Sequence, residues 1–227
     1  QGPNNSTNLA NNLPATASVA SDPHLNILAA GTVTNGVVLE FDFIPTGDTL
    51  NFRYIFGSEE YPEFSPSTYN DAFGLFLWGP GITGPYALAG YSNGANIATI
   101  PGGIPVTINN VGDASNTQYY VFNDNGSTYG NAIQYDGTTV LLTAAASVQC
   151  NQTYHIKLAI SNVSDQAYDS GVFLEANSFS SNVVDVAVAT VSGDTTIIEG
   201  CNFADIVFTR PEGNMLDTLS IIYTIGG

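Results

Sequence analysis

Acidic and amide side chains that can bind a cation occur at three places where apolar runs begin or end. Two glutamates follow the alternating run 50–56, an Asn-Asp pair precedes the run 72–78, and two aspartates precede the run 171–176. Aromatic residues flank the first group, so its carboxylates must face either open water or a positive charge. The candidate ligands are Glu59, Glu60, Asn70, Asp71, Asp165 and Asp169.

Calcium binding is the chemistry that these residue types suit best. They offer only oxygen ligands, and calcium takes about six to eight oxygens in a flexible geometry. A β-sandwich brings the ends of distant strands together, so sequence separation does not prevent a shared site. The sequence therefore predicts a Ca²⁺ site, in which Ser58, Ser170 and backbone carbonyls could complete the shell. Two alternatives stay open: a hydrogen-bond network centred on Arg53, and carboxylates that cap turns or face solvent.

No catalytic residues are predicted. Glycosidase chemistry needs two carboxyl groups that face each other across a cleft, whereas Glu59 and Glu60 are neighbours whose side chains should point to opposite faces. A pair such as Glu59 with Asp169 is geometrically allowed, but nothing in the sequence favours it. His24 and His155 belong to no Ser/His/Asp pattern, and the scattered His and Cys residues form no zinc motif. We therefore expect a protein that is not an enzyme, and a carbohydrate-active enzyme is the least favoured function.

The charge balance excludes two classes of partner. The 227 residues include 20 Asp and Glu but only three Lys and Arg, which gives a formal net charge of −17. Such a field repels nucleic acid and anionic lipid, and no apolar run is long enough to span a membrane. The composition, with scarce Lys and abundant Asn, Thr, Gly and Tyr, favours an extracellular protein. For Cys150 and Cys201, a partner outside this chain is at least as good an expectation as a bridge between them.

Alternation with a period of two residues dominates the chain. Large apolar residues take every second position in 37–43 and 50–56, and further apolar runs follow up to residue 176. Turn signals such as Asn35-Gly36 and Asp136-Gly137 separate these runs. The pattern predicts an all-β, jelly-roll-like antiparallel sandwich. One helical turn is expected after Asp22, which can cap it, because Pro23 suits the first helical position.

A change of composition near residue 180 divides the chain. The polar segment 180–182 resembles a short linker after the aromatic strands. Three alternating runs follow at 184–191, 204–209 and 219–225, and three strands are too few to close a stable sandwich. We therefore predict a β-sandwich domain over 1–180 and the first strands of an incomplete Ig-like module over 183–227.

A series of motifs gives the first domain a specific family resemblance. They include Phe41-Asp42-Phe43-Ile44-Pro45, Glu59-Glu60-Tyr61-Pro62-Glu63-Phe64, Asn70-Asp71-Ala72-Phe73-Gly74, Gln134-Tyr135-Asp136-Gly137 and Tyr168-Asp169-Ser170-Gly171. These motifs, and their order along the chain, resemble those of the choice-of-anchor L domain over about residues 2–179. The tail from Val186 to Gly227, with Glu199-Gly200-Cys201, is similar to the start of Calx-β-like repeats.

The resemblance implies a domain of large exported bacterial surface proteins, which the type IX secretion system often delivers in gliding and biofilm-forming bacteria. It implies no particular ligand. Together with the acidic clusters, it leads us to expect a calcium-stabilised adhesin module that presents loop Tyr and Asn side chains to a glycan or protein on a surface. The alternative is a stalk or filament unit that contacts neighbouring domains or copies of itself. Core packing explains most of the many aromatic residues equally well.

Overall fold

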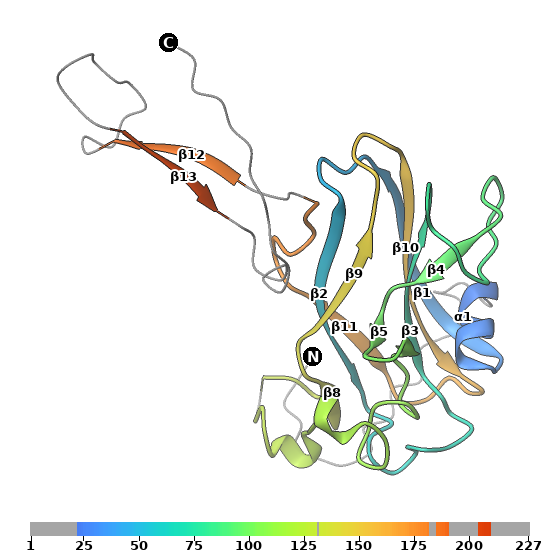
Figure 1. Cartoon of the computed structure of the whole chain (residues 1–227). Coiled ribbons are helices and arrows are strands. Elements are labelled where there is room, and N and C mark those ends of the chain that lie inside the picture. Colours follow the sequence, from blue (N-terminus) through green and yellow to red (C-terminus); the bar gives the residue numbers. More distant parts are fainter. Residues whose placement is uncertain (1–21, 131, 182–184, 191–203, 210–227) are drawn as a thin grey trace.

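The computed structural model describes residues 22–130, 132–181, 185–190 and 204–209 (Figure 1). The regular elements of the described chain are mostly antiparallel strands, with one short α-helix and two single-turn 3₁₀ helices. This arrangement confirms the expected all-β sandwich. None of the helices within those ranges is long and apolar enough to cross a membrane.

Two antiparallel sheets form the sandwich. Strands far apart in sequence pair within both of them, as in jelly-roll-like folds. The first sheet has the order β1 (Val33–Phe43), β10 (Tyr154–Val163), β3 (Ala72–Trp78) and β4 (Gly94–Asn96). The second has the order β11 (Ser170–Leu174), β2 (Thr49–Ser58), β8 (Gly137–Thr139) and β7 (Tyr120–Phe122), and β9 (Leu142–Ser147) also pairs with β2.

The remaining elements are short. Strands β5 (Thr99–Ile100) and β6 (Ile104–Pro105) form a separate two-stranded sheet, and the 3₁₀ turns are Thr117–Tyr119 and Asp124–Gly126. Strands β12 (Asp185–Thr190) and β13 (Ala204–Thr209) pair with each other after the sandwich. The run 219–225 and Cys201 lie outside the described residues, so the boundary near 180 and the incomplete second module stay predictions. Cys150 is exposed and forms no disulfide with another described residue.

Alternating residues of β2 and β3 build the main core between the sheets. Their inward side chains are almost completely buried, as a strand with one face against the core requires. They are Leu50, Phe52, Tyr54, Phe56, Phe73, Leu75 and Leu77. The alternation in the sequence therefore places the β2 core residues correctly.

Helix α1 (Pro23–Ala29) covers the other face of the first sheet and makes a second core (Figure 1). Leu25 and Leu28 of the helix pack there with Phe76 and Trp78 of β3. Because both faces of β3 are covered, its seven residues are all buried and read as a continuous apolar run. The side chain of Asp22 caps the helix by accepting hydrogen bonds from the backbone N–H groups of His24 and Leu25, which confirms the predicted cap.

The open side of the sandwich lies between the edge strands β1 and β11. On β1, Val37 and Leu39 alternate as core residues would, yet they are 61% and 53% exposed. These side chains face the gap between the two sheets, where β11 covers them only in part. An apolar groove results, lined by Val37, Leu39, Phe73, Leu158, Ala159, Ile160, Val172 and Leu174.

One polar atom of the main core gives a test of its packing. The Tyr54 hydroxyl is buried without a hydrogen-bond partner in the described part of the chain. We expect Tyr54→Phe to raise the free energy of unfolding by roughly 1 kcal/mol, because it removes the desolvation penalty of that hydroxyl. Urea denaturation would measure the change.

Tyr154 supplies the matched control for that variant. Its hydroxyl accepts a hydrogen bond from Gln149 N at 2.7 Å and donates one to Pro80 O at 2.7 Å. Tyr154→Phe should therefore lower the free energy of unfolding by about 1–2 kcal/mol. Equal destabilisation by both variants would contradict this account of the core.

Candidate metal centre

A row of carboxylates lies at one end of the second sheet, where strand β2 ends and strands β8 and β11 begin. Gly137 of β8 and Ser170 of β11 both pair with Ser58, the last residue of β2. The next residue of β2 is Glu59, and the antiparallel register brings the residues before Gly137 and Ser170 to its two sides. These neighbours are Asp136 and Asp169, and the backbone N–H of Glu59 donates to the carbonyl of Asp169 at 3.0 Å.

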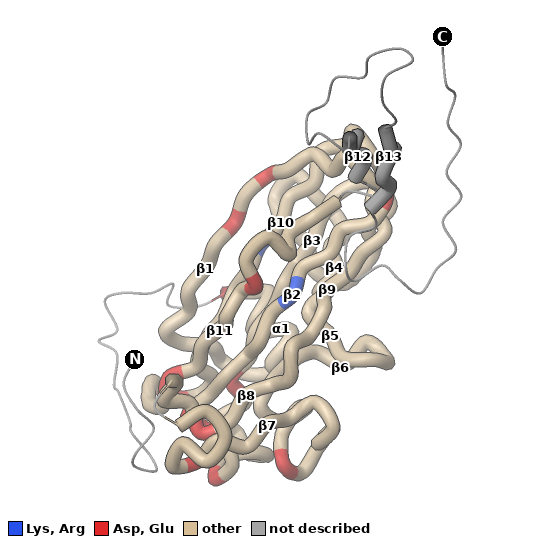
Figure 2. The backbone as a smooth tube through the Cα atoms, turned by 90° about the vertical axis from the view of Figure 1, so that its left-hand side faces the viewer, with Lys and Arg blue, Asp and Glu red and all other residues tan. Residues whose placement is uncertain are grey.

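A second group of carboxylates lies where β3 begins. Asp71 immediately precedes β3, the charges of Asp71 and Asp165 act on Glu60, and the charge of Asp165 also acts on Asp71. The two groups adjoin, because Asp169 also acts on Asp71. Figure 2 shows Asp and Glu positions gathered at this end of the sandwich, near β8. We call this set the acidic end: Glu59, Glu60, Asp71, Asp136, Asp165 and Asp169.

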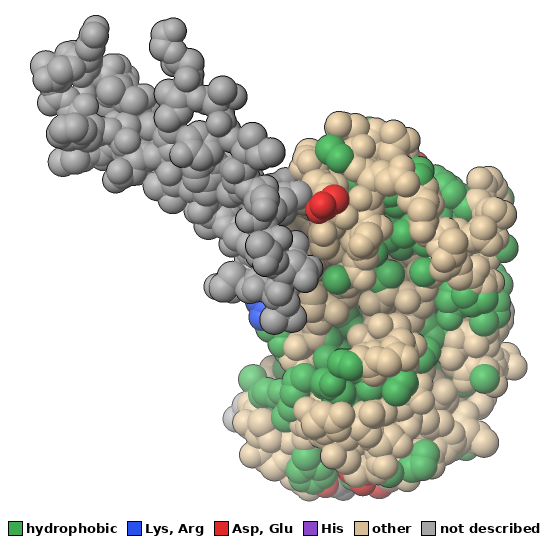
Figure 3. Space-filling model, in the orientation of Figure 1, with side chains coloured by type: hydrophobic (Ala, Val, Ile, Leu, Met, Phe, Trp, Pro, Cys, Tyr) green, Lys and Arg blue, Asp and Glu red, His purple; other side chains and the backbone are tan. Residues whose placement is uncertain are grey.

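Burial separates these carboxylates from ordinary surface acids. Glu59 is 2% exposed, and Glu60, Asp71 and Asp136 are completely buried. Although the chain is strongly acidic, few Asp and Glu side chains are visible on the face in Figure 3. This burial argues against the alternative in which the carboxylates of Glu59 and Glu60 face solvent.

Several oxygens of the acidic end have no partner within the described residues. Both carboxylate oxygens of Glu60 are buried without a hydrogen bond, and so are Oε2 of Glu59 and Oδ1 of Asp169. Asp71 differs, because its Oδ1 accepts from Val163 N at 2.9 Å and its Oδ2 accepts from the Ser170 hydroxyl at 2.6 Å. The Ser58 hydroxyl lies 2.8 Å from the Ser170 hydroxyl oxygen, which can accept its hydrogen, and this contact links β11 to β2 at the same point.

Burial and mutual repulsion make these acids hard to ionise. Burial, with the charges of Asp136 and Asp169, raises the pKa of Glu59 to about 8. Burial, with the charges of Asp71 and Asp165, raises the pKa of Glu60 to about 9. Burial also raises the pKa of Asp71 to about 8, against the lowering effect of its two hydrogen bonds. Protonation at neutral pH would remove the charge but leave the oxygens of Glu60 without partners, whereas a bound cation would satisfy both requirements.

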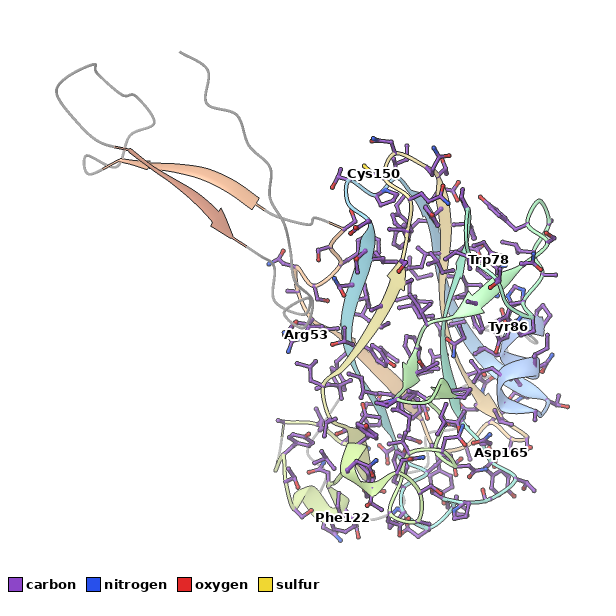
Figure 4. The ribbon with its side chains drawn as sticks, viewed as in Figure 1. Arg53, Trp78, Tyr86, Phe122, Cys150 and Asp165 are labelled. Carbon is purple, nitrogen blue, oxygen red and sulfur yellow. The ribbon has the colours of Figure 1, made fainter. Side chains whose placement is uncertain are left out.

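Arg53 forms an ion pair away from the acidic end. Its Nη1 lies 3.0 Å from Oε2 of Glu175, and Figure 4 shows Arg53 on the side of the sandwich, away from Asp165. Lys157 pairs with Asp22 beneath helix α1. Among the residues that the structure describes, no Lys or Arg forms an ion pair with Glu59 or Glu60. The ion pair that the structure gives Arg53 is thus with Glu175, and the network centred on Arg53 stays an alternative to a cation.

Besides Asp71, two more of the six predicted ligands have other contacts. The Asn70 amide nitrogen donates to Ala29 O at 3.1 Å, and its oxygen accepts from Asn109 N at 3.2 Å. Asp165 is half-buried, and its Oδ1 accepts from Ala167 N at 3.1 Å in a local turn. Asn70 thus fastens its loop to neighbouring segments, and Asp165 approaches the acidic end from the outside.

Asp136 is a candidate ligand that the sequence-based prediction missed. It lies in the turn motif before β8, where an Asp is ordinarily explained by turn formation. The only signal available was its place in the family motif 134–137. Its position beside Glu59 follows from the pairing of β8 with β2, which the sequence does not reveal.

A calcium ion at the acidic end would need oxygen ligands of several kinds in its coordination shell. Within the described ranges, no group of three or more His, Cys, Asp or Glu side chains is already arranged to hold a metal ion. The buried, unpartnered oxygens nevertheless match the oxygen-only chemistry of calcium. The residues present fit a calcium ion if carboxylates rotate toward one another and hydroxyls or backbone carbonyls complete the coordination.

The aromatic residues are divided between core and loops. Trp78, Tyr61 and Tyr86 are buried, so core packing explains them. Phe122 is 46% exposed in the segment that leads to Asp136, and Tyr119 and Tyr129 of that segment are half-buried. Figure 4 shows Phe122 at the extremity of the sandwich. Phe64, Tyr69 and Tyr168, which are also half-buried, pack together in neighbouring loops, so more than one loop at this end carries accessible aromatic side chains.

Comparison with known proteins places the chain in a family. A family model described as the Choice-of-anchor L domain matches residues 1–180. No curated protein and no solved structure matches the chain significantly. The matched segment covers the whole sandwich and every residue of the acidic end. The chain therefore belongs to the choice-of-anchor L domain family, whose members are non-catalytic domains of secreted or cell-surface proteins.

Proposed function

We propose that this domain is a non-enzymatic adhesin module of a large secreted bacterial surface protein, and that calcium at the acidic end stabilises its recognition loops. The burial of both Glu60 carboxylate oxygens without a partner among the described residues carries this proposal. A hard cation is the partner that would satisfy several such oxygens at once. Membership of a surface-domain family supports the extracellular setting, where calcium is abundant.

The acidic end offers ligands from four separate segments. Glu59 and Glu60 follow β2, Asp71 precedes β3, Asp136 precedes β8 and Asp169 precedes β11. The Ser58 and Ser170 hydroxyls lie beside them and could supply neutral donors. One ion bound by these segments would tie both sheets together at this end, so its binding energy would add to the folding free energy.

Rigid loops at this end would present a recognition surface. The segment 113–136 ends at Asp136 and carries Phe122, Tyr119 and Tyr129. Aromatic side chains stack on sugar rings and pack against apolar protein surfaces. Calcium binding at Asp136 would reduce the conformational entropy that this segment loses when it meets a glycan or a protein.

Binding arrays with and without calcium would test the recognition role. We expect glycan or protein binding that is lost in chelator and falls at least about tenfold in Phe122→Ala, since exposed aromatics dominate such interfaces. Ile44→Ala, which truncates a 60% exposed side chain in the β1–β2 connection, is the matched control and should bind normally. Binding that is indifferent to both calcium and Phe122 would contradict the proposal.

The apolar groove between β1 and β11 favours a second function, that of a stalk or filament unit. Exposed apolar patches on edge strands commonly mark contacts with another chain or domain. If the domain associates with its own copies there, sedimentation should show concentration-dependent dimers, and Leu39→Asp should abolish them. Monomers at all concentrations, together with array binding, would favour the adhesin function instead.

A further inference from the structure

A buried polar cluster links helix α1 to β10 on the opposite side of the first sheet from the main core. Lys157 of β10 is 5% exposed and contacts the carboxylate of Asp22, which is 3% exposed. His24, also 3% exposed, completes the cluster. Lys157 is the only lysine of the 227 residues, so the one lysine ε-amine of this sequence is buried.

Aromatic rings enclose this cluster. The His24 ring centroid lies 5.3 Å from that of Phe76, 5.0 Å from that of Trp78 and 6.1 Å from that of Tyr86. Lys157 Nζ lies 5.9 Å from the Phe76 centroid. Figure 4 shows Trp78 and Tyr86 on the side of the sheet that faces α1. A charged amine and a charged carboxylate are costly in such surroundings, whereas a neutral product of the two is not.

The hydrogen bonds distinguish the two oxygens of Asp22. Its Oδ1 accepts from the backbone N–H groups of His24 and Leu25, each at 3.0 Å, while its Oδ2 contacts Lys157 Nζ. Two backbone donors on one oxygen can stabilise the negative charge that develops there when a nucleophile attacks the carboxyl carbon. The other oxygen lies on the amine side, where a leaving group would be protonated.

The tautomer of His24 leaves Nδ1, the ring nitrogen nearest Lys157, free to accept a proton. Its Nε2 lies 2.9 Å from the carbonyl oxygen of Ala87, which can only accept a hydrogen bond, so Nε2 carries the proton. Its Nδ1 then presents a lone pair 3.1 Å from Lys157 Nζ. The imidazole can thus take a proton from the amine and deliver it to an oxygen in contact with that amine.

We propose that Lys157 and Asp22 condense into an intramolecular isopeptide bond, with loss of one water molecule. A proton passes from the Lys157 ammonium to Oδ2 of Asp22, which leaves a neutral amine and a carboxylic acid. The Nζ lone pair attacks Cγ, and the negative charge on Oδ1 is held by the two backbone N–H groups. His24 Nδ1 takes one proton from the nitrogen and returns it to Oδ2, the Cγ–Oδ2 bond breaks, and water leaves. The amide keeps one hydrogen on Nζ, so the three hydrogens of the ammonium are all accounted for.

Proximity and enclosure favour this reaction without an added reagent. Amine and carboxyl are held in contact by a folded core, which replaces a bimolecular encounter by an intramolecular one. The two residues are 135 positions apart in sequence. The bond would therefore close most of the domain into a covalent loop and fasten α1 to the sheet, and loss of the two buried charges favours the product.

Intact-mass spectrometry of the purified full chain tests the proposal. We expect the wild-type protein to be lighter than its sequence by one water molecule, and Lys157→Met and Asp22→Ala to have their full sequence masses. Tandem spectra of a digest should show the peptide that contains Asp22 joined to the one that contains Lys157. In the denatured wild-type protein, an amine-reactive reagent should label no lysine.

Two comparisons make the result decisive. Cyclisation of Gln1 removes ammonia rather than water and would persist in Lys157→Met, so it cannot imitate the isopeptide bond.

His24→Gln should slow the loss of water at least about tenfold after refolding, because it removes the proton acceptor. A wild-type protein of full mass, with Lys157 completely labelled after denaturation, would show that the pair is only an ion pair and would overturn the proposal. This outcome is independent of calcium binding.

Discussion

Saturating calcium should raise the melting temperature of the domain by roughly 6–16 °C at pH 8. A ligand at about 100 to 1,000 times its Kd stabilises the folded state by about 3–4 kcal/mol. For a domain of this size each kcal/mol corresponds to about 2–4 °C. The physical reason is the set of buried carboxylate oxygens that lack partners at the end of β2. Differential scanning calorimetry in calcium and in chelator measures the shift.

The same experiment should show a different dependence on pH in the two conditions. The pKa values of Glu59, Glu60 and Asp71 are raised to about 8, 9 and 8 in the folded domain, whereas in the unfolded chain they lie near 4. Between about pH 5 and pH 9 the folded state therefore holds more protons, and the unfolding free energy in chelator should fall as pH rises. Calcium replaces those protons, so its stabilising effect should grow with pH.

Proton release provides an independent measurement of this linkage. Calcium titrations in buffers of different ionisation enthalpy should show that protons leave the protein as the ion binds, because the ligands must be ionised. Magnesium at the same concentration controls for general screening of the negative charge, and it should stabilise less because it demands a small octahedral site. Equal effects of calcium and magnesium, without proton release, would refute the calcium site.

Replacing Glu60 by glutamine should raise the stability of the calcium-free domain and reduce the stabilisation that calcium gives. Glu60→Gln removes a buried acid with two unpartnered oxygens but keeps the shape of the side chain. In chelator at pH 8 the variant should be more stable than the wild type by about 1–3 kcal/mol, since the desolvation and repulsion of that acid disappear. In calcium it should lose most of the stabilisation that the ion gives the wild type. Urea unfolding with and without calcium measures both effects.

Glu40→Gln is the matched control for this variant. It removes the same charge from an exposed side chain of β1, which is 52% accessible and lies outside the acidic end. Its calcium response should equal that of the wild type, and its stability should change by less than about 0.5 kcal/mol. If Glu60→Gln kept the full calcium response, the ion would have to bind elsewhere and the acidic end would not be its site.

The sequence alone was sufficient for the local features of the fold. Alternating apolar residues locate β2 and predict which of its side chains form the core, because side chains of a strand point alternately to its two faces. The Asp22-Pro23 pair predicts the start of α1, since capping depends only on adjacent residues. Motifs of the acidic and aromatic segments were enough to identify the family, which the match over residues 1–180 confirms.

Only the tertiary structure decided which polar groups share a buried environment. Glu59 meets Asp136 and Asp169 because β8 and β11 pair on either side of β2, and the sequence shows nothing of that register. Likewise Lys157 meets Asp22 only because α1 folds across β10. The exposure of Val37 and Leu39 depends on the sheet edges in the same way. Periodicity is a property of neighbouring residues, whereas charge pairing, desolvation and exposure depend on contacts between segments distant in the chain.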